Sequence, residues 1–430
     1  METKTFFYYG FSLLAATAIL FSRCQKEDEK NTLVVTTTDV TEITRTAATT
    51  GGNITDDGGA EVTARGVCWC TDQNPTINDS KTEDGSGVGS FYSRIAGLEP
   101  NTTYYVRAYA KNKSGTVYGE QQVFTTLPPL SWAITNFTED DGLISNRINS
   151  LAVDDSNNIW AATSAGLAKF DGSSWTSYTT ADGLIDDAIR VLSFNPDGNL
   201  WIGSWESGVS RFDGQTWTNY TEEDGLYSNH IYSIHADQNG NILIGSRNNH
   251  LTIFDGSTFD SFAVNPKPNP DGTIMGHIHA IHDDHDGNLW VGSCYTGLSM
   301  FDGENWTHDI NNLSSFINTI FCTSDGDIWL GQSPLGAFQY SNDSWKNYPE
   351  RETMIRFVYT VGEDANGNIW VGGRDGISVF KEDAWEFISS EDGLINTVAG
   401  SIVGDNDGAI WVGGVNGLSK ITPLENTKSQ

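Results

Sequence analysis

The chain of 430 residues carries 24 Lys and Arg against 56 Asp and Glu, a formal net charge of −32. A surface this negative repels phosphate backbones and anionic lipid headgroups, so it argues against nucleic acid as a partner. The length favours two or more domains, and 45 Gly, 14 Trp, 15 Tyr and 20 Phe favour short strands joined by tight turns.

The first 23 residues are typical of an export signal. Lys4 supplies a modest positive charge, and the apolar run Phe6–Phe21 is too short to span a bilayer comfortably. The segment ending in Ser22, Arg23 and Cys24 resembles a bacterial lipoprotein signal. That resemblance implies cleavage at 23/24 and lipidation of Cys24, although Phe21 and Arg23 depart from the usual pattern. An uncleaved N-terminal anchor is the alternative.

A charged run, Gln25–Lys30, follows within a predicted tether over residues 24–33. It resembles the Lys/acidic signal that sends some Gram-negative lipoproteins to the outer face of the outer membrane. We therefore expect an extracytoplasmic, outer-membrane lipoprotein that is displayed on the cell surface and contacts the membrane only through its lipid.

Residues 34–127 are predicted to form a small all-β domain, because β-branched and aromatic runs alternate with Gly, Asp and Asn clusters. The stretch Gly97–Ala110 resembles the fibronectin type III signature with its tyrosine corner. The resemblance implies that the Tyr104 hydroxyl bonds back to the backbone at the turn. No catalytic set is evident here, so we expect a spacer, followed by the stiff linker Thr126–Pro129.

From residue 130 to residue 424 a pentapeptide such as Asn199-Leu200-Trp201-Ile202-Gly203 recurs seven times. Its central residues, 39 to 47 positions apart, are Trp160, Trp201, Leu243, Trp290, Trp329, Trp370 and Trp411. The second unit is predicted to hold four strands: Ile189–Phe194, Asn199–Ser204, Gly208–Phe212 and Thr216–Tyr220. A four-stranded unit repeated at this period indicates a seven-bladed β-propeller. We therefore predict an all-β protein, in which a fibronectin type III-like sandwich precedes the propeller.

The repeat residues are expected to be structural. The tryptophans should wedge between neighbouring blades. The last unit stops before its fourth strand, and Ser131–Phe137 precedes the first unit as an unpaired strand. Pairing these two segments would close the ring and remove its open edges.

The repeat also resembles the two-component regulator propeller. The stretch Asp141–Ile148 and the core Asn199–Gly203 carry this resemblance, which extends over nearly the whole of residues 130–424. Members of that family are met in the periplasmic sensor halves of hybrid histidine kinases that respond to oligosaccharides. Those sensors usually have two propellers, a membrane span and a kinase. This sequence shows one propeller and neither of the others, so signal transmission does not carry over.

Binding is expected on the face of the disc where the varied loops lie, near the mouth of the central channel. Aromatic, Arg, Asn and His side chains there suit a hydroxyl-rich or anionic ligand. The candidate residues are Arg147, Asn149, Arg190, Trp205, His230, Tyr232, Arg247, His277, His279, Tyr295, Tyr359 and Arg374. The insertion Asn265–Pro270 is predicted on the same face. A solvated channel without a ligand is the alternative.

When the repeats are aligned on their tryptophans, His230, His277 and His279 converge near the channel mouth and could bind zinc or a similar metal. His282 has the opposite strand parity and His285 lies in a turn, so neither should join them. No cofactor is expected otherwise.

Three functions remain open. The first is a non-catalytic surface or periplasmic lipoprotein whose propeller binds a glycan or a protein. The second is a polysaccharide lyase or hydrolase with its site at the propeller mouth, using His277, His279, Tyr232 and Arg190. The third is a structural subunit of an assembly.

Overall fold

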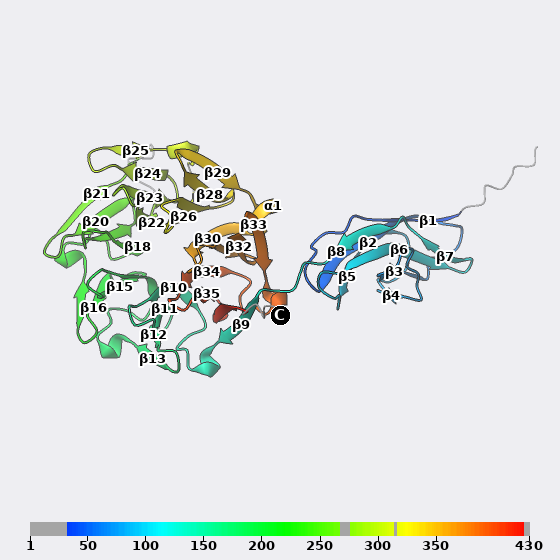
Figure 1. The fold of residues 1–430 in the computed structure, drawn as a ribbon, viewed down its shortest axis with the longest axis horizontal. Coiled ribbons are helices and arrows are strands. Elements are labelled where there is room, and N and C mark those ends of the chain that lie inside the picture. The colour runs from blue at the N-terminus through cyan, green and yellow to red at the C-terminus, as the bar shows by residue number, and fades with distance from the viewer. Residues whose placement is uncertain (1–31, 267–275, 314–315, 425–430) are drawn as a thin grey trace, which may run out of the picture. The chain divides into compact units, whose positions relative to one another are not determined.

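The computed structural model describes residues 32–266, 276–313 and 316–424, and the chain divides into two compact units between Pro129 and Leu130 (Figure 1). The predicted signal peptide, Cys24 and the tether up to residue 31 lie outside the described residues. So do residues 267–270 of the predicted insertion. In the ranges described, no helix has both the length and the apolar character needed to cross a membrane.

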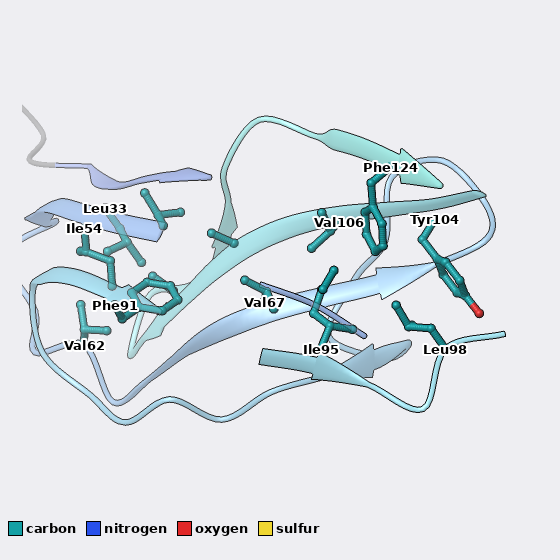
Figure 2. Close-up of a cluster of buried hydrophobic side chains, with 14 residues drawn as sticks. Leu33, Ile54, Val62, Val67, Phe91, Ile95, Leu98, Tyr104, Val106 and Phe124 are labelled. Carbon is teal, nitrogen blue, oxygen red and sulfur yellow. The ribbon is translucent and has the colours of Figure 1, made fainter. Parts of the chain in front are cut away.

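The first unit is a pair of antiparallel sheets around one apolar core. One sheet has the order β1-β2-β5, with β1 Leu33–Thr37, β2 Ala47–Asp57 and β5 Gly89–Ala96. The other has the order β4-β3-β6-β7 with β8 also paired to β6, the strands being β3 Ala64–Cys70, β4 Ser80–Lys81, β6 Thr103–Asn112, β7 Gly115–Tyr118 and β8 Gln122–Thr125. Figure 2 shows the buried side chains of this core, among them Ile54, Val67, Phe91 and Val106.

Tyr104 makes the hydrogen bond expected of it. Its hydroxyl accepts from the Glu99 backbone N–H at 3.0 Å, and its ring stacks on Phe124 with centroids 5.8 Å apart (Figure 2). The predicted bond is therefore confirmed. It ties the turn before β6 to the sheet that β6 and β8 form.

The second unit is a propeller of seven four-stranded antiparallel sheets. Blades one to three are β10 Ile148–Val153, β11 Ile159–Thr163, β12 Leu167–Phe170 and β13 Trp175–Tyr178; β14 Ile189–Phe194, β15 Leu200–Ser204, β16 Val209–Phe212 and β17 Trp217–Tyr220; β18 Ile231–Ala236, β19 Ile242–Ser246, β20 His250–Phe254 and β21 Phe259–Ala263. Blades four to six are β22 Ile278–Asp283, β23 Leu289–Ser293, β24 Gly297–Phe301 and β25 Trp306–His308; β26 Ile317–Cys322, β27 Ile328–Gln332, β28 Gly336–Ser341 and β29 Ser344–Tyr348; β30 Arg356–Glu363, β31 Ile369–Arg374, β32 Gly376–Lys381 and β33 Ala384–Ile388. The four strands predicted for the second repeat begin and end within one residue of β14, β15, β16 and β17.

The seventh blade closes the ring. It combines β34 Ala399–Gly404, β35 Ile410–Gly414 and β36 Leu418–Pro423 with β9 Trp132–Phe137, in the order β34-β35-β36-β9. The first strand of each blade contacts that of the next, and β34 contacts β10 (Figure 1). The prediction that the segment before the first unit completes the last one is confirmed.

Each repeat tryptophan packs into the seam with the following blade, as predicted. Trp160 lies with Ile189 and Leu200 of the second blade, and Trp411 lies with Leu143 and Ile159 of the first. The other seams are built in the same way around Trp201, Leu243, Trp290, Trp329 and Trp370.

Steric crowding explains why a glycine ends the pentapeptide. A Cβ on Gly203 would lie 2.6 Å from Cγ2 of Ile231, and one on Gly413 would lie 2.5 Å from Cγ2 of Ile148. In both cases the isoleucine belongs to the inner strand of the next blade. The glycine therefore lets neighbouring blades approach closely.

Short helices connect most blades. The turns η1 Glu139–Asp141, η2 Thr180–Asp182, η3 Glu222–Asp224 and η5 Ser390–Asp392 each follow a Thr or Ser that forms a capping box with the Asp. Each ends at a glycine with positive φ, such as Gly142 at 100°. The recurring Asp-Gly-Leu is therefore the end of a helical turn. The remaining connections include η4 Ile310–Asn312 and α1 Glu350–Thr353.

Candidate functional site

A β-bulge at the start of every inner strand turns one side chain out of the regular ladder. In β10 the pairing steps from Ile148↔Thr163 to Ser150↔Ala162, which leaves Asn149 as the extra residue. The same step recurs in all seven blades and gives the row Asn149, Arg190, Tyr232, His279, Asn318, Tyr359 and Gly400. Bulges re-aim side chains and are common beside binding sites.

Five of the predicted residues form a continuous stack, which we call the mouth stack: Trp205, Arg190, Tyr232, His277 and His279. The Arg190 guanidinium carbon lies 4.2 Å from the Trp205 ring centroid and 3.8 Å from that of Tyr232. The Tyr232 ring lies parallel to His277, with centroids 4.2 Å apart, and edge-on to His279 at 5.2 Å. Arg190, Tyr232 and His279 lie on the inner strands β14, β18 and β22. Trp205 lies in the loop after β15, and His277 immediately precedes β22.

The positive charge of the mouth stack belongs to arginine. Burial lowers the pKa of Arg190, and Tyr232 opposes that shift, but a guanidinium stays charged at neutral pH. Burial and the charges of Arg190 and Arg247 lower the pKa of His277. Burial, together with Arg190 and His277, lowers the pKa of His279 to about 4. Both imidazoles are therefore neutral at pH 7.

One ring atom in the mouth stack has a free hydrogen-bonding position. Nδ1 of His277 is buried and has no hydrogen-bond partner among the residues that the structure describes. A buried polar atom without a partner costs free energy, commonly about 1–3 kcal/mol. A ligand or a water that bonds to it would remove that cost.

Other predicted residues have structural tasks or lie apart. Asn149 donates from Nδ2 to the Ile189 carbonyl at 2.7 Å. Asn318, which was not predicted but occupies the same bulge position in the fifth blade, donates to the Val358 carbonyl at 2.8 Å. These amides link neighbouring blades. Within the described ranges no hydrogen bond, ion pair or ring contact joins Arg147, Tyr295, Tyr359 or Arg374 to the mouth stack. Tyr295 lies beside Phe316, with ring centroids 5.8 Å apart.

His230 and Arg247 lie close enough to His277 to influence it electrostatically, and Arg247 forms an isolated β-bridge with His277. His230, His277 and His279, however, do not bring three ligand atoms within 4.8 Å of one another. The geometry gives no support to a metal at these three histidines.

Cys294 also contacts the mouth stack, although it is not among the predicted residues. The thiol is buried, and its Sγ accepts from the His277 backbone N–H at 3.2 Å. Burial raises its pKa. Cys294 therefore positions His277, the residue that immediately precedes the fourth inner strand. Its place directly after the strand that ends in Ser293 was the signal available in the sequence.

His282 lies away from the mouth stack, as its strand parity predicted. Its ring lies 4.7 Å from that of His235, which occupies the same position in the neighbouring blade. On the face of the propeller away from the mouth stack, a hollow of about 580 Å³ lies between the fourth and fifth blades. Turn residues line most of it, including Asp284, Asp286 and Asp325.

The sequence model of the family described as two component regulator propeller matches residues 142–165 and 275–295. The first match spans the turn into the first blade, and the second contains His277 and His279. No curated protein matches the chain.

Solved structures with the same fold are distant in sequence. The extracellular domain assigned to the hybrid two component system BT3049 from B. thetaiotaomicron is 16% identical with a TM-score of 0.58; the match covers 90% of this chain and 56% of that one. Streptogramin B lyase is 13% identical with a TM-score of 0.54, covering 68% of this chain and 98% of the other. YCF48 bound to D1 peptide is 14% identical with a TM-score of 0.53, covering 70% and 99%. This chain thus spans little more than half of the BT3049 domain.

Proposed function

We propose that the chain is an extracytoplasmic, non-catalytic propeller that binds a glycan carrying an anionic group at the mouth stack. The observation that carries the proposal is the Arg190 guanidinium held between Trp205 and Tyr232. Aromatic faces pack on the C–H faces of sugar rings, and a fixed guanidinium forms paired hydrogen bonds with a carboxylate or sulfate.

The charge distribution supports an anionic rather than a cationic group. The protein carries a net charge of −32, yet this mouth concentrates Arg190 and Arg247 beside two neutral histidines. Holding two like charges together in a partly buried site costs free energy. An anion bound between them would offset that cost.

The extracytoplasmic placement rests on the lipoprotein-type segment that ends at Cys24 and on the match to the regulator propeller family. The fold-level likeness to an extracellular sensor domain is compatible with it. We propose a surface lipoprotein that captures its ligand through the propeller.

A glycan array probed with tag-free residues 31–430 tests the proposal, with titration calorimetry on the sugars that bind. We expect Arg190→Gln and Trp205→Ala to weaken binding at least tenfold. Arg351→Gln is the matched control, because Arg351 is exposed and lies 3.9 Å from the neighbouring Glu352 carboxylate. Binding that survives both mouth variants unchanged would refute the site, and binding of a protein but no glycan would refute the ligand class.

A polysaccharide lyase is the second candidate, because the Tyr232 ring lies against a neutral His277 with a free Nδ1. A lyase needs a base for the proton beside a uronate carboxylate and a cation to neutralise that carboxylate. Incubating each array-positive polysaccharide with the protein and following the unsaturated product separates the two. Turnover that His277→Gln abolishes would replace the binding proposal with the enzymatic one.

A further inference from the structure

A second cluster of metal-ligating side chains lies at the other end of the inner strands, away from the mouth stack. His235 is near the end of β18, while His282 and Asp283 end β22. One ligand atom from each residue lies within 4.8 Å of the other two. Among the described residues this is the one group of three or more His, Cys, Asp or Glu with that property.

The three side chains already contact one another. Nε2 of His235 lies 2.5 Å from Oδ1 of Asp283, and Nδ1 of His282 lies 4.0 Å from the same oxygen. In a tetrahedral zinc site with bonds of about 2.0–2.1 Å, neighbouring ligand atoms are about 3.3 Å apart. A small side-chain rotation would thus open the distance between Nε2 of His235 and Oδ1 of Asp283 around an ion.

Neighbouring groups hold the cluster in a form ready for a metal. The Gln238 backbone N–H donates to Oδ2 of Asp283 at 3.1 Å, which orients the carboxylate. Nδ1 of His282 lies 2.7 Å from the Asp283 backbone carbonyl, so donation there leaves Nε2 of His282 as the ligand atom.

The cluster departs from the repeat. At the positions of His235 and His282 the other blades have Ala152, Ser193, Phe321, Gly362 and Val403. The two histidines therefore occur only in the third and fourth blades, which are neighbours. A single stray histidine would need no explanation, but two on adjacent strands with a carboxylate make a bridging set.

We propose that His235, His282 and Asp283 bind a divalent transition-metal ion that joins the third and fourth blades. Two imidazoles and one carboxylate suit zinc and its neighbours rather than calcium or magnesium, and water would complete the coordination. The ion is inferred to be structural, because its ligands come from two blades that pack against each other.

Titration calorimetry of Zn²⁺ into chelator-treated, tag-free residues 31–430 tests this, with Co²⁺ absorption as a second probe of coordination. We expect one Zn²⁺ per chain and a melting temperature higher by roughly 5 °C at a hundredfold excess over Kd. His235→Asn and His282→Asn should each weaken Zn²⁺ binding at least tenfold and remove the shift.

The double variant His277→Asn, His279→Asn is the matched control. It removes one histidine of β22 and the histidine just before that strand, and it leaves His235, His282 and Asp283 unchanged. It should bind Zn²⁺ like the wild type. Absence of binding at 100 µM Zn²⁺, or loss of binding only in this control, would overturn the proposal. Melting each variant without metal separates a folding defect from lost coordination.

Discussion

The indole N–H groups of four repeat tryptophans are held by one residue of the preceding turn. Trp160, Trp290, Trp370 and Trp411 donate to Asp154, Asp284, Asp364 and Asp405, at 2.8 to 3.0 Å. In the first blade the same aspartate also accepts from the Asn158 backbone and side chain. A single carboxylate thus closes the turn and anchors the ring that fills the next seam.

The second blade lacks this anchor. Asn195 stands at the aspartate position, and the buried N–H of Trp201 has no partner among the described residues. Arg211 is the cross-strand neighbour of Trp201. In the first blade, Lys169 is the cross-strand neighbour of Trp160, and the Lys169 ammonium lies 3.8 Å from Asp154. A carboxylate at position 195 would therefore find both a donor and a positive charge nearby.

We expect Asn195→Asp to stabilise the propeller by about 1 kcal/mol, the usual net worth of one hydrogen bond. In a domain of this size that raises the melting temperature by about 2 °C. The reverse change in the seventh blade, Asp405→Asn, should lower it by a similar amount. Equal melting temperatures for the wild type and Asn195→Asp would show that the indole N–H costs nothing where it is.

At the level of single residues, the sequence could place the mouth stack only in part. Aligning the repeats on their tryptophans identified Arg190, Tyr232 and His279 as one row, because every blade has the same backbone. The bulge that aims this row was not predictable, since it is a register step between two strands. The use of Asn149 as a link to the next blade was equally hidden, because its partner is a carbonyl 40 residues away.

Strand β9 determines whether the propeller is a ring. It pairs along its whole length with β36, from Leu418↔Phe137 to Pro423↔Trp132. Trp132 also packs edge-on against Trp370 at 4.8 Å. Without β9 the last blade would keep an open edge, and the seam with the first blade would lose Phe137, which stacks on Trp411 at 5.6 Å.

Removing β9 should therefore cost much more than a change of similar chemistry at the surface. We expect deletion of residues 130–137 to abolish the cooperative melting of the propeller, and Phe137→Ala to destabilise it by about 3 kcal/mol. Tyr92→Ala is the control, because that ring is 81% exposed. Circular dichroism melts that show the same midpoint for Phe137→Ala and Tyr92→Ala would contradict this role of β9.

Strands were predictable wherever the repeat supplied several copies of one pattern. The predicted Ile189–Phe194 coincides with β14 because turn glycines bound it in each blade. Strand β2, in contrast, is hard to predict from the sequence, because Gly51 and Gly52 lower its strand propensity. The structure explains them: a Cβ on Gly51 would meet the Phe91 carbonyl oxygen, and one on Gly52 would meet the Phe91 ring.

For the propeller as a whole, the seam between the third and fourth blades differs from the other six. Leu243 replaces the tryptophan there, and the seam has six buried hydrophobic residues among those described, against eight to eleven in the other seams. Polar links take over part of the packing. Asn249, fully buried, accepts from Ser293 at 2.7 Å and donates to Thr296 at 2.9 Å.

A closed ring opens most readily where the least apolar surface holds neighbouring blades together. We therefore expect the amides of β19 and β22 to exchange with solvent deuterium sooner than the equivalent amides of β31 and β34. Asn249→Ala should speed exchange at β19 and β22 by roughly 10- to 100-fold, because it leaves buried polar partners unpaired. Asn396→Ala removes an equally buried amide from the seventh blade, so it should speed exchange there instead. Uniform exchange around the ring, with no local response to Asn249→Ala, would mean that the seven seams open together and that burial in one seam does not set its stability.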